Sequence, residues 1–490
     1  MMKKKALTAA ASLLLCALLL ASCGAAGGGT TAVTTAGMSG ETSAVTEADE
    51  YKYPDADYGG HTFLILNQDE CDWANMLIAP DESNGELIND ALYNRNVRIE
   101  EKFNVKIKEQ RVPYDDIKKI TKNVVTAGDD TYDMIPFPLN EMGALITENY
   151  FVDLLSVDSL NLTEPWWDQT VIGDATMNGK CYLASSDISF FPFEATWVIY
   201  FNRGILDNLG LDVPYDLVRD GKWTLDRLIE YTAAASDINS DDSFKYDAVS
   251  GTAQYGMLSH DQLMNVMLFG ADEKLVSFDD GSPVYTGNTD RFYSVCSKIT
   301  QLTAPDGQYI DRTLVKLATP TNNSVLEFKN NRFLFVSETL GHIKDLRDFE
   351  SEFGVLPMPK YEETQDAYYS MIATWGTLLT TIPVTNGDTE RTGVILDVLA
   401  YDSYKTLMEP YYETYLTQKG ARDEDSAEML RIIRDSRTLN VGVLFNWTSD
   451  VLTKLDAALC KGNSDVASIV EKQLAKIESN MEKSMELFNS

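Results

Sequence analysis

Polar and aromatic side chains recur in this 490-residue chain at the positions where buried strands are expected to end. Ligands of open parallel sheets bind beyond the carboxyl ends of the strands, so a site is first sought at these positions. Carboxylates and amides can each pair with two sugar hydroxyls, and an aromatic ring can cover the apolar face of a pyranose. This mixture predicts a carbohydrate-binding site formed by Asn67, Glu70, Trp166, Asp187, Glu194, His260, Glu338 and Trp375.

Each of these side chains also has a purely structural interpretation. A Trp at the start of a strand often belongs to the core, and this applies to Trp375. Trp166 and Trp167 are neighbours that would point to opposite sides of a strand, so at most one of them is expected to stack on a ligand. The carboxylates of the set can equally be solvated loop residues.

The elements that must position the site alternate between strand and helix. Short apolar or alternating runs predict the strands, and apolar residues at helical spacing predict the helices between them. Such alternation is typical of a mostly parallel sheet with helices on both faces, which places the chain in the α/β class. The expected strands are 62–66, 105–108, 132–135 and 197–201, with a loop at 136–140, and the expected helices include 87–103 and 117–127.

The stretch 197–235 combines several unlike elements in one order. An apolar strand ends at Asn202, a short helix ends at Gly210, and Thr224 is placed to cap a longer helix. This order resembles the signature of extracellular solute-binding proteins of ABC importers, of the family 1-like carbohydrate type. The matching residues are Tyr200, Asn202, Gly210, Pro214 and Asp226, whereas Trp223 and Thr224 invert the family's usual order.

The resemblance extends in order and rough spacing over about residues 58–405. It departs from the family's pattern at Asn331 and Arg332, where Gly and Lys are expected, and the C-terminal helices fit less distinctively. The phrases that carry it are 132–135, 150–154, 165–167, 178–182, 254–257, 328–336 and 354–359.

The resemblance implies a two-lobed periplasmic-binding-protein-like fold with hinge crossovers and a C-terminal helical region. The crossovers are expected near 195–202, 333–338 and 380–386. A ligand in the cleft would bridge both lobes and thereby favour the closed state. The expected division is 58–196 plus 339–382 for the first lobe and 199–334 plus 384–490 for the second.

The N-terminus carries targeting signals. Three lysines at 3–5 precede the apolar run 6–21, which is typical of a secretory signal and shorter than the roughly 20 residues that a membrane span needs. The run ends in Leu-Ala-Ser before Cys23, which resembles the lipobox of bacterial lipoproteins. The resemblance implies a signal peptide over 1–22, a lipid on Cys23 and a flexible tether over 23–57, with the protein anchored on the extracytoplasmic face of the cell membrane.

Composition excludes several classes of function. The chain has 41 Lys and Arg against 75 Asp and Glu, and its formal charge of −34 disfavours binding to nucleic acid. Three scattered His residues, and Cys residues without metal-ligand spacing, indicate neither a metal nor a cofactor. The disulfide state stays open for Cys71, Cys181, Cys296 and Cys460.

Other functions remain open from the sequence. A glycoside-active enzyme would use two carboxylates, but Asp and Glu are so frequent that pairs carry no information, and no HExxH, GxSxG or SxxK phrase is present. A peptide- or polyamine-binding receptor of the same fold would also suit the acidic surface. We predict a non-enzymatic, monomeric receptor that captures a carbohydrate, expected to be an oligosaccharide, and delivers it to an ABC permease in the membrane.

Overall fold

The structure is a computed structural model that describes residues 51–69, 74–260, 262–319, 323–375, 377–416, 424–463 and 465–488. The fold below is that of the compact unit Tyr53–Ser490. Within the described ranges, none of the helices combines the length and apolar character that crossing a bilayer requires.

The larger sheet is formed by β4 (Trp197–Asn202), β5 (Tyr255–Ser259), β8 (Tyr309–Asp311), β9 (Phe333–Thr339) and β10 (Phe353–Leu356). Its strand order is β10-β4-β9-β5-β8. Strand β5 is parallel to β8 and β9, whereas β4 is antiparallel to β9 and β10. Because β4, β5, β9 and β10 are buried along their whole length, their sequences are continuous and largely apolar rather than alternating.

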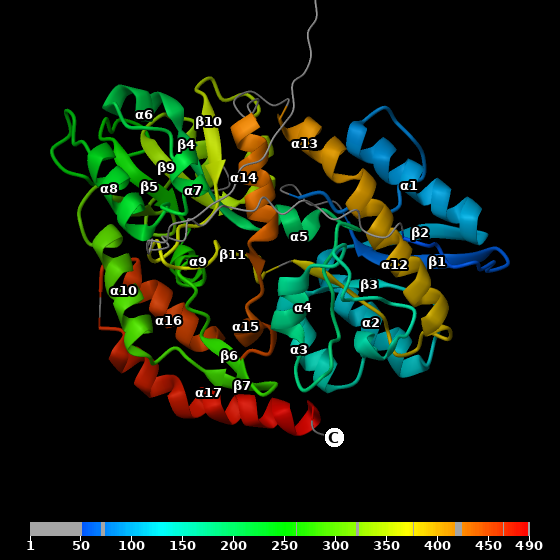
Figure 1. Cartoon of the computed structure of the whole chain (residues 1–490). Coiled ribbons are helices and arrows are strands. Elements are labelled where there is room, and N and C mark those ends of the chain that lie inside the picture. Colours follow the sequence, from blue (N-terminus) through cyan, green and yellow to red (C-terminus); the bar gives the residue numbers. More distant parts are fainter. Residues whose placement is uncertain are drawn as a thin grey trace, which may run out of the picture. The chain divides into compact units, whose positions relative to one another are not determined.

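Helices pack against this sheet, namely α6 (Arg203–Leu209), α8 (Leu225–Ala235), α10 (Asp290–Thr303) and α11 (Ser324–Phe328). Figure 1 shows α6 and α8 beside β4, β5 and β9. Asn202 ends β4 and caps α6, because its Oδ1 accepts the N–H of Ile205 at 3.1 Å. Gly210 ends α6 in the left-handed conformation, with φ of 65°. Thr224 occupies the predicted N-cap position of α8, but its side chain makes no capping hydrogen bond within the described helix.

A second group of strands contains β1 (His61–Gln68), β2 (Val105–Val112), β3 (Ile135–Pro138) and β12 (Leu378–Thr381). Strands β1 and β2 are parallel, β3 and β12 are antiparallel, and a parallel bridge joins Ile65 of β1 to Met134. The helices between these strands confirm the predicted alternation, and they are α1 (Leu87–Phe103), α2 (Tyr114–Ala127) and α3 (Leu139–Thr147).

The prediction of a loop at 136–140 is wrong, because β3 occupies its first part and α3 begins in the second. The Leu139 N–H donates to the carbonyl of Thr377 at 2.8 Å, so the odd-numbered residues of β3 are the ones whose backbone groups form hydrogen bonds with β12. Pro136 and Pro138 therefore turn the sides that lack an N–H away from the partner strand, where no ladder hydrogen bond is lost.

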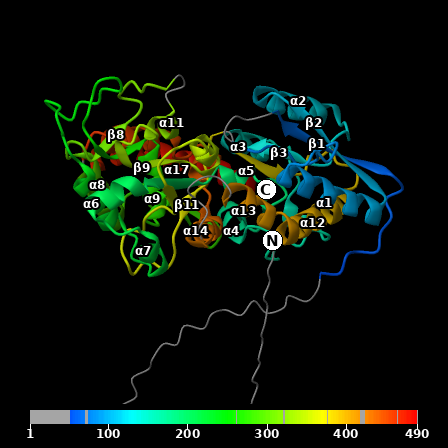
Figure 2. The same cartoon turned by 90° about the horizontal axis from the view of Figure 1, so that it is seen from above.

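The C-terminal region is helical, as predicted, and contains α12 (Thr389–Thr406), α13 (Met408–Leu416), α14 (Glu424–Asp435), α15 (Val441–Leu444), α16 (Ser449–Leu459) and α17 (Ala467–Phe488). Helices α12 and α13 pack against α1, and Figure 2 shows α1 and α12 side by side. Helix α14 packs against β10 of the larger sheet. The lobe limits stay a prediction, but these contacts argue for counting 389–416 with the first lobe and 353–356 with the second.

The remaining elements are short. Helix α9 (Leu263–Gly270) follows β5, and β6 (Val276–Asp279) forms a hairpin with β7 (Ser282–Tyr285) that contacts α17 (Figure 1). Strand β11 (Ser370–Met371) pairs in parallel with β13 (Arg437–Thr438). The others are the 3₁₀ helices η1 (Leu154–Ser156) and η2 (Leu340–Leu346) and the helices α4 (Gln169–Ala175), α5 (Phe191–Glu194) and α7 (Tyr215–Arg219).

Three carboxylates lie in and beside α4, and we call Asp168, Asp174 and Asp187 the acidic row. They pair with Lys and Arg side chains, and with a hydroxyl and a backbone N–H, from later in the chain. Arg437 of β13 lies 2.8 Å from Asp168, with both side chains more than nine-tenths buried. Arg434 of α14 pairs with the buried Asp187. Burial raises the pKa of Asp168, and the Arg437 guanidinium opposes that rise.

The third member of the acidic row, Asp174, binds on both of its oxygens. Lys274 Nζ lies 2.6 Å from Oδ1, while the Thr438 hydroxyl and the Leu439 N–H donate to Oδ2 at 2.8 and 2.9 Å. The acidic row therefore holds the segment between α14 and α15 in place.

We expect Arg437→Met to lower the free energy of unfolding by about 3–5 kcal/mol at pH 7, because it leaves Asp168 buried without its cation. Since Arg437 lowers the pKa of Asp168, that pKa rises further in the variant. A carboxyl group whose pKa is raised in the folded state destabilises the protein as the pH rises through that pKa. The difference in the free energy of unfolding between variant and wild type should therefore shrink on acidification. Urea unfolding at several pH values measures it.

Arg227→Met is the matched control, since Arg227 is exposed and pairs only with the exposed Glu230 in the ion pairs that the described residues form. It should change stability by less than about 1 kcal/mol. Adding Asp168→Asn to Arg437→Met should recover part of the loss. A loss of stability in Arg437→Met that is small at pH 7, or that grows on acidification, would contradict the conclusion that Arg437 compensates the buried charge of Asp168.

Candidate functional site

The carboxyl ends of β5, β8 and β9 meet at one edge of the larger sheet. Ser259 pairs with Ser337 of β9 and with Asp311 of β8, so the residues that follow these strands lie together. The chain before β4 joins the same edge, because Leu340 donates to the carbonyl of Thr196 at 2.9 Å. This is the edge at which a ligand of such a sheet is expected.

The segment that follows β11 also reaches this edge. The N–H of Ala373 donates to the carbonyl of Ala195 at 2.8 Å, and Thr196 forms an antiparallel bridge with Ile372. Thr374 and Trp375 come directly after these contacts, so their backbone is held beside the end of the sheet.

A cavity of about 190 Å³ opens among the start of α9, which follows β5, the residues 371 and 374 in and after β11, and the helices α15 and α16. Seven of its lining side chains are polar and three are apolar, so most of the lining can form hydrogen bonds with a polar ligand. The polar residues are Gln262, Asn265, Thr374, Asn440, Ser449, Thr453 and Asp456, and the apolar ones are Met371, Val443 and Leu452.

Asp456 of α16 holds the first turn of α9 at the cavity wall. Its Oδ1 accepts the backbone N–H of Asn265 at 3.1 Å, and its Oδ2 accepts the side-chain Nδ2 of the same residue at 2.5 Å. A carboxylate at the N-terminus of a helix also interacts favourably with the helix dipole. Both contacts fix the position of Asn265.

Asn440 holds the opposite wall. Its Oδ1 accepts the N–H of Val443 at 3.1 Å and so caps α15, while Nδ2 lies 4.0 Å from the sulfur of Met371. The pairing of β11 with β13 brings these two residues together, with Ile372 donating to the carbonyl of Thr438 at 3.0 Å.

Two of the predicted site residues lie beside this cavity. His260 is partly exposed, and its Nδ1 accepts the N–H of the lining residue Gln262 at 3.2 Å. Tyr309 donates to the carbonyl of His260 at 3.3 Å, and burial raises the pKa of Tyr309 well above its usual range, so this hydroxyl stays a neutral donor. Trp375 is partly exposed and directly follows the lining residue Thr374.

Two further predicted site residues, Asn67 in β1 and Glu194 in α5, are fully buried and bonded to the protein. Asn67 donates to the carbonyl of Met76 at 2.7 Å and to Glu109 at 2.9 Å. Glu194 accepts the hydroxyl of Tyr411 at 3.2 Å and the N–H of Asn75. In this structure both side chains therefore hold the segment 75–76 in place, and neither is open to a ligand.

Two other predicted carboxylates are buried and form ion pairs with partly exposed arginines. Asp187 pairs with Arg434 as part of the acidic row, and Glu338 lies 3.0 Å from Arg312 while it also accepts the N–H of Thr339 at 3.3 Å. Their contact with a ligand stays a prediction.

Trp166 lies against the C-terminal helices. Its indole N–H donates to Asp397 of α12 at 2.9 Å, as does that of Trp167, and its ring packs edge-on against Tyr401. Both Trp side chains are more than nine-tenths buried. The predicted residues Glu70 and Cys23 lie outside the described part of the chain.

Sequence reasoning missed Asn265, Asn440 and Asp456. None of them directly follows a predicted strand, and two belong to the C-terminal helices, where the chain matched no distinctive pattern. Asn440 carries one usable signal, because an Asn before a short apolar run is typical of an N-cap.

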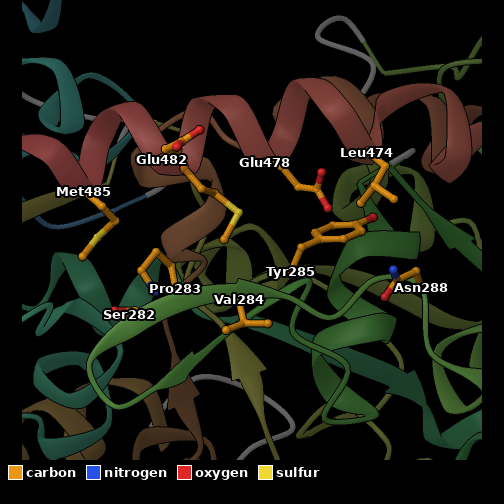
Figure 3. Close-up of a pocket in the computed structure, with 10 residues that line it drawn as sticks. Ser282, Pro283, Val284, Tyr285, Asn288, Leu474, Glu478, Glu482 and Met485 are labelled. Atoms are coloured by element: carbon orange, nitrogen blue, oxygen red, sulfur yellow. The ribbon is translucent and has the colours of Figure 1, made fainter.

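A second cavity, of about 460 Å³, lies between α17 and the strand β7. Figure 3 shows Pro283 and Tyr285 pointing from β7 toward the helix, whereas Val284 points away from it. Helix α17 contributes Leu474, Met481 and Met485 along with two glutamates. With Asn288 as the one amide among its described lining residues, this groove offers fewer hydrogen-bonding groups to a sugar than the first cavity.

Solved structures resemble this chain, although no protein-family model and no curated protein matches it. A sugar transporter protein of Rhizobium etli in an open conformation aligns with 85% of this chain and 99% of its own at 15% identity, with a TM-score of 0.57. The galacto-N-biose/lacto-N-biose I-binding protein of the ABC transporter of Bifidobacterium longum, in complex with lacto-N-biose, aligns with 87% of this chain and 98% of its own at 13% identity, with a TM-score of 0.56. The apo form of RafE from Streptococcus pneumoniae aligns with 88% of this chain and 100% of its own at 16% identity, with a TM-score of 0.55.

The chain has the fold of these sugar-binding proteins. The predicted two-lobed, periplasmic-binding-protein-like α/β fold is therefore confirmed, because each alignment covers 85–88% of this chain and nearly the whole of the other chain. At identities of 13–16% the likeness establishes the fold, and the ligand must be argued from the site itself.

Proposed function

We propose that this chain is the substrate-binding protein of an ABC importer and that it captures a carbohydrate, expected to be an oligosaccharide, without turning it over. The observation that carries the proposal is the polar cavity at the carboxyl edge of the larger sheet. Its amides and hydroxyls can pair with sugar hydroxyls from several directions. The similarity of the fold to sugar-binding proteins of transporters supports the same ligand class.

Trp375 would supply the aromatic surface of this site. It comes directly after the lining residue Thr374 in the sequence, and part of its own surface is accessible. A pyranose ring placed against it would gain stacking in addition to hydrogen bonds, and a few such contacts suffice for a micromolar Kd, which corresponds to a binding free energy of roughly −8 kcal/mol. His260, beside Gln262, is the second predicted residue that we retain as a ligand contact.

Capture would proceed by hinge closure. The lining comes from the start of α9, from residues 371 and 374, and from two C-terminal helices, so one ligand would touch segments that are far apart in the sequence. A ligand that bridges such segments favours the state in which all of its contacts are made. The closed monomer would then deliver the sugar to a permease, while a lipid on Cys23 would keep the receptor at the extracytoplasmic face of the membrane.

The proposal is tested by thermal unfolding of the full chain, in mild detergent, against neutral oligosaccharides, peptides and polyamines. A sugar at 100 times its Kd should raise the free energy of unfolding by about 2.7 kcal/mol, with no product formed on long incubation. Stabilisation by peptides or polyamines alone would retain the fold and contradict the carbohydrate ligand. Turnover of a sugar would contradict the receptor function.

We expect Trp375→Ala to weaken binding of the stabilising sugar about tenfold, measured by calorimetry, because it removes the stacking surface at a cost of about 1.4 kcal/mol. Trp166→Phe is the matched aromatic control. It removes one hydrogen bond to Asp397 and should lower the stability by about 1 kcal/mol while leaving the affinity unchanged. An affinity that falls only in the Trp166 variant would contradict this placement of the sugar.

We expect Cys23→Ser to abolish labelling by a fatty-acid analogue in bacterial cells, because the thiol that would carry the lipid is missing. Cys16→Ser, which changes a Cys within the leader, should leave labelling intact. Equal labelling of the wild type and the Cys23 variant would contradict the lipid anchor without affecting the ligand proposal.

A further inference from the structure

The cavity proposed above to bind the sugar is lined by one charged side chain among its ten described residues. That residue is Asp456, and the lining includes neither Lys nor Arg. Asp456 is 5% exposed, so its charge acts in a region where water screens it poorly. The formal charge of −34 on the whole chain acts in the same direction.

Asp456 also sets the direction in which Asn265 presents its amide. Because Asn265 Nδ2 donates to Asp456 Oδ2 at 2.5 Å, the Oδ1 end of the amide points elsewhere. That oxygen is buried and makes no hydrogen bond with the part of the chain that the structure describes. A buried acceptor of this kind is satisfied when a ligand brings a donor to it.

We propose that Asp456 and Asn265 make the cavity specific for ligands that present hydrogen-bond donors without negative charge, namely neutral or amino sugars, and that they exclude sugar acids and sugar phosphates. The inference rests on the proposed function and names the class of sugar. A sugar acid would bring a second negative charge beside a buried carboxylate, and like charges at close range are strongly unfavourable. A hydroxyl or ammonium group instead donates to the acceptors.

The test compares a neutral sugar that stabilises the full chain with two of its analogues. In one a terminal hydroxymethyl group is oxidised to a carboxylate, and in another the hydroxyl at the same carbon is replaced by an amine. Calorimetry on the wild-type chain should give a Kd at least about tenfold weaker for the acid, and an equal or tighter Kd for the amine. Equal binding of the acid, or equal weakening of both analogues, would overturn the inference.

Asp456→Asn should reduce the discrimination against the acid to within about threefold, because the amide removes the charge and keeps the size of the side chain. Asp450→Asn is the matched control, since Asp450 lies on the same helix, is 57% exposed and pairs with Lys476 outside the cavity. It should keep the wild-type ratio, and an unchanged ratio in the Asp456 variant would overturn the inference. If Asp456→Asn fails to fold, the acid and amine measurements on the wild type still decide the question.

The two proposals fail on different outcomes. Failure of every sugar to bind overturns the proposed function itself. Binding of neutral and acidic sugars with equal affinity leaves the proposed function intact and overturns only the assignment of Asp456 and Asn265 as specificity-determining residues.

Discussion

The ion pairs of the acidic row determine where the segment between α14 and α15 lies. Asp168 pairs with Arg437, and Asp187 pairs with Arg434. Asp174 accepts hydrogen bonds from Thr438 and Leu439, the two residues after Arg437. These contacts bring β13 alongside β11, and this pairing in turn places Asn440 against Met371 at the wall of the cavity. Buried charges of this kind contribute little net stability, but the loss of one partner is costly, so they specify one arrangement of the chain.

A second constraint acts from the opposite side of the cavity. Asp456 accepts two hydrogen bonds from Asn265, so α16 cannot move away from the end of β5 without leaving a buried carboxylate uncompensated. The cavity is therefore held by carboxylates on both sides, one group beside α4 and one on α16. This arrangement explains how residues nearly 200 positions apart form a single polar lining.

The local elements could be read from the sequence where apolar patterns and caps are strong. Helix α1 matches its predicted range, and the order of strand, Asn cap, short helix and Gly end at β4 and α6 is correct. A strand was predicted at 132–135, but β3 lies at Ile135–Pro138, because Pro136 and Pro138 signal a loop and only the pairing with β12 shows that their missing N–H groups cost nothing. His260 lies beside the cavity because it follows β5 of the larger sheet, and Trp375 does so because the segment after β11 is bonded to residues 195 and 196. Asp187 and Glu338 met their partners Arg434 and Arg312 only through tertiary contacts, which single-sequence reasoning cannot supply.

The most direct measurement is a crystal structure of the full chain with a bound neutral oligosaccharide that stabilises it. We expect the sugar in the cavity beside the end of β5, with a ring against Trp375 and a hydroxyl within hydrogen-bond distance of Asn265 Oδ1. A sugar found instead in the groove between α17 and β7, or one without contact to Asn265 and Thr374, would contradict the proposed binding site.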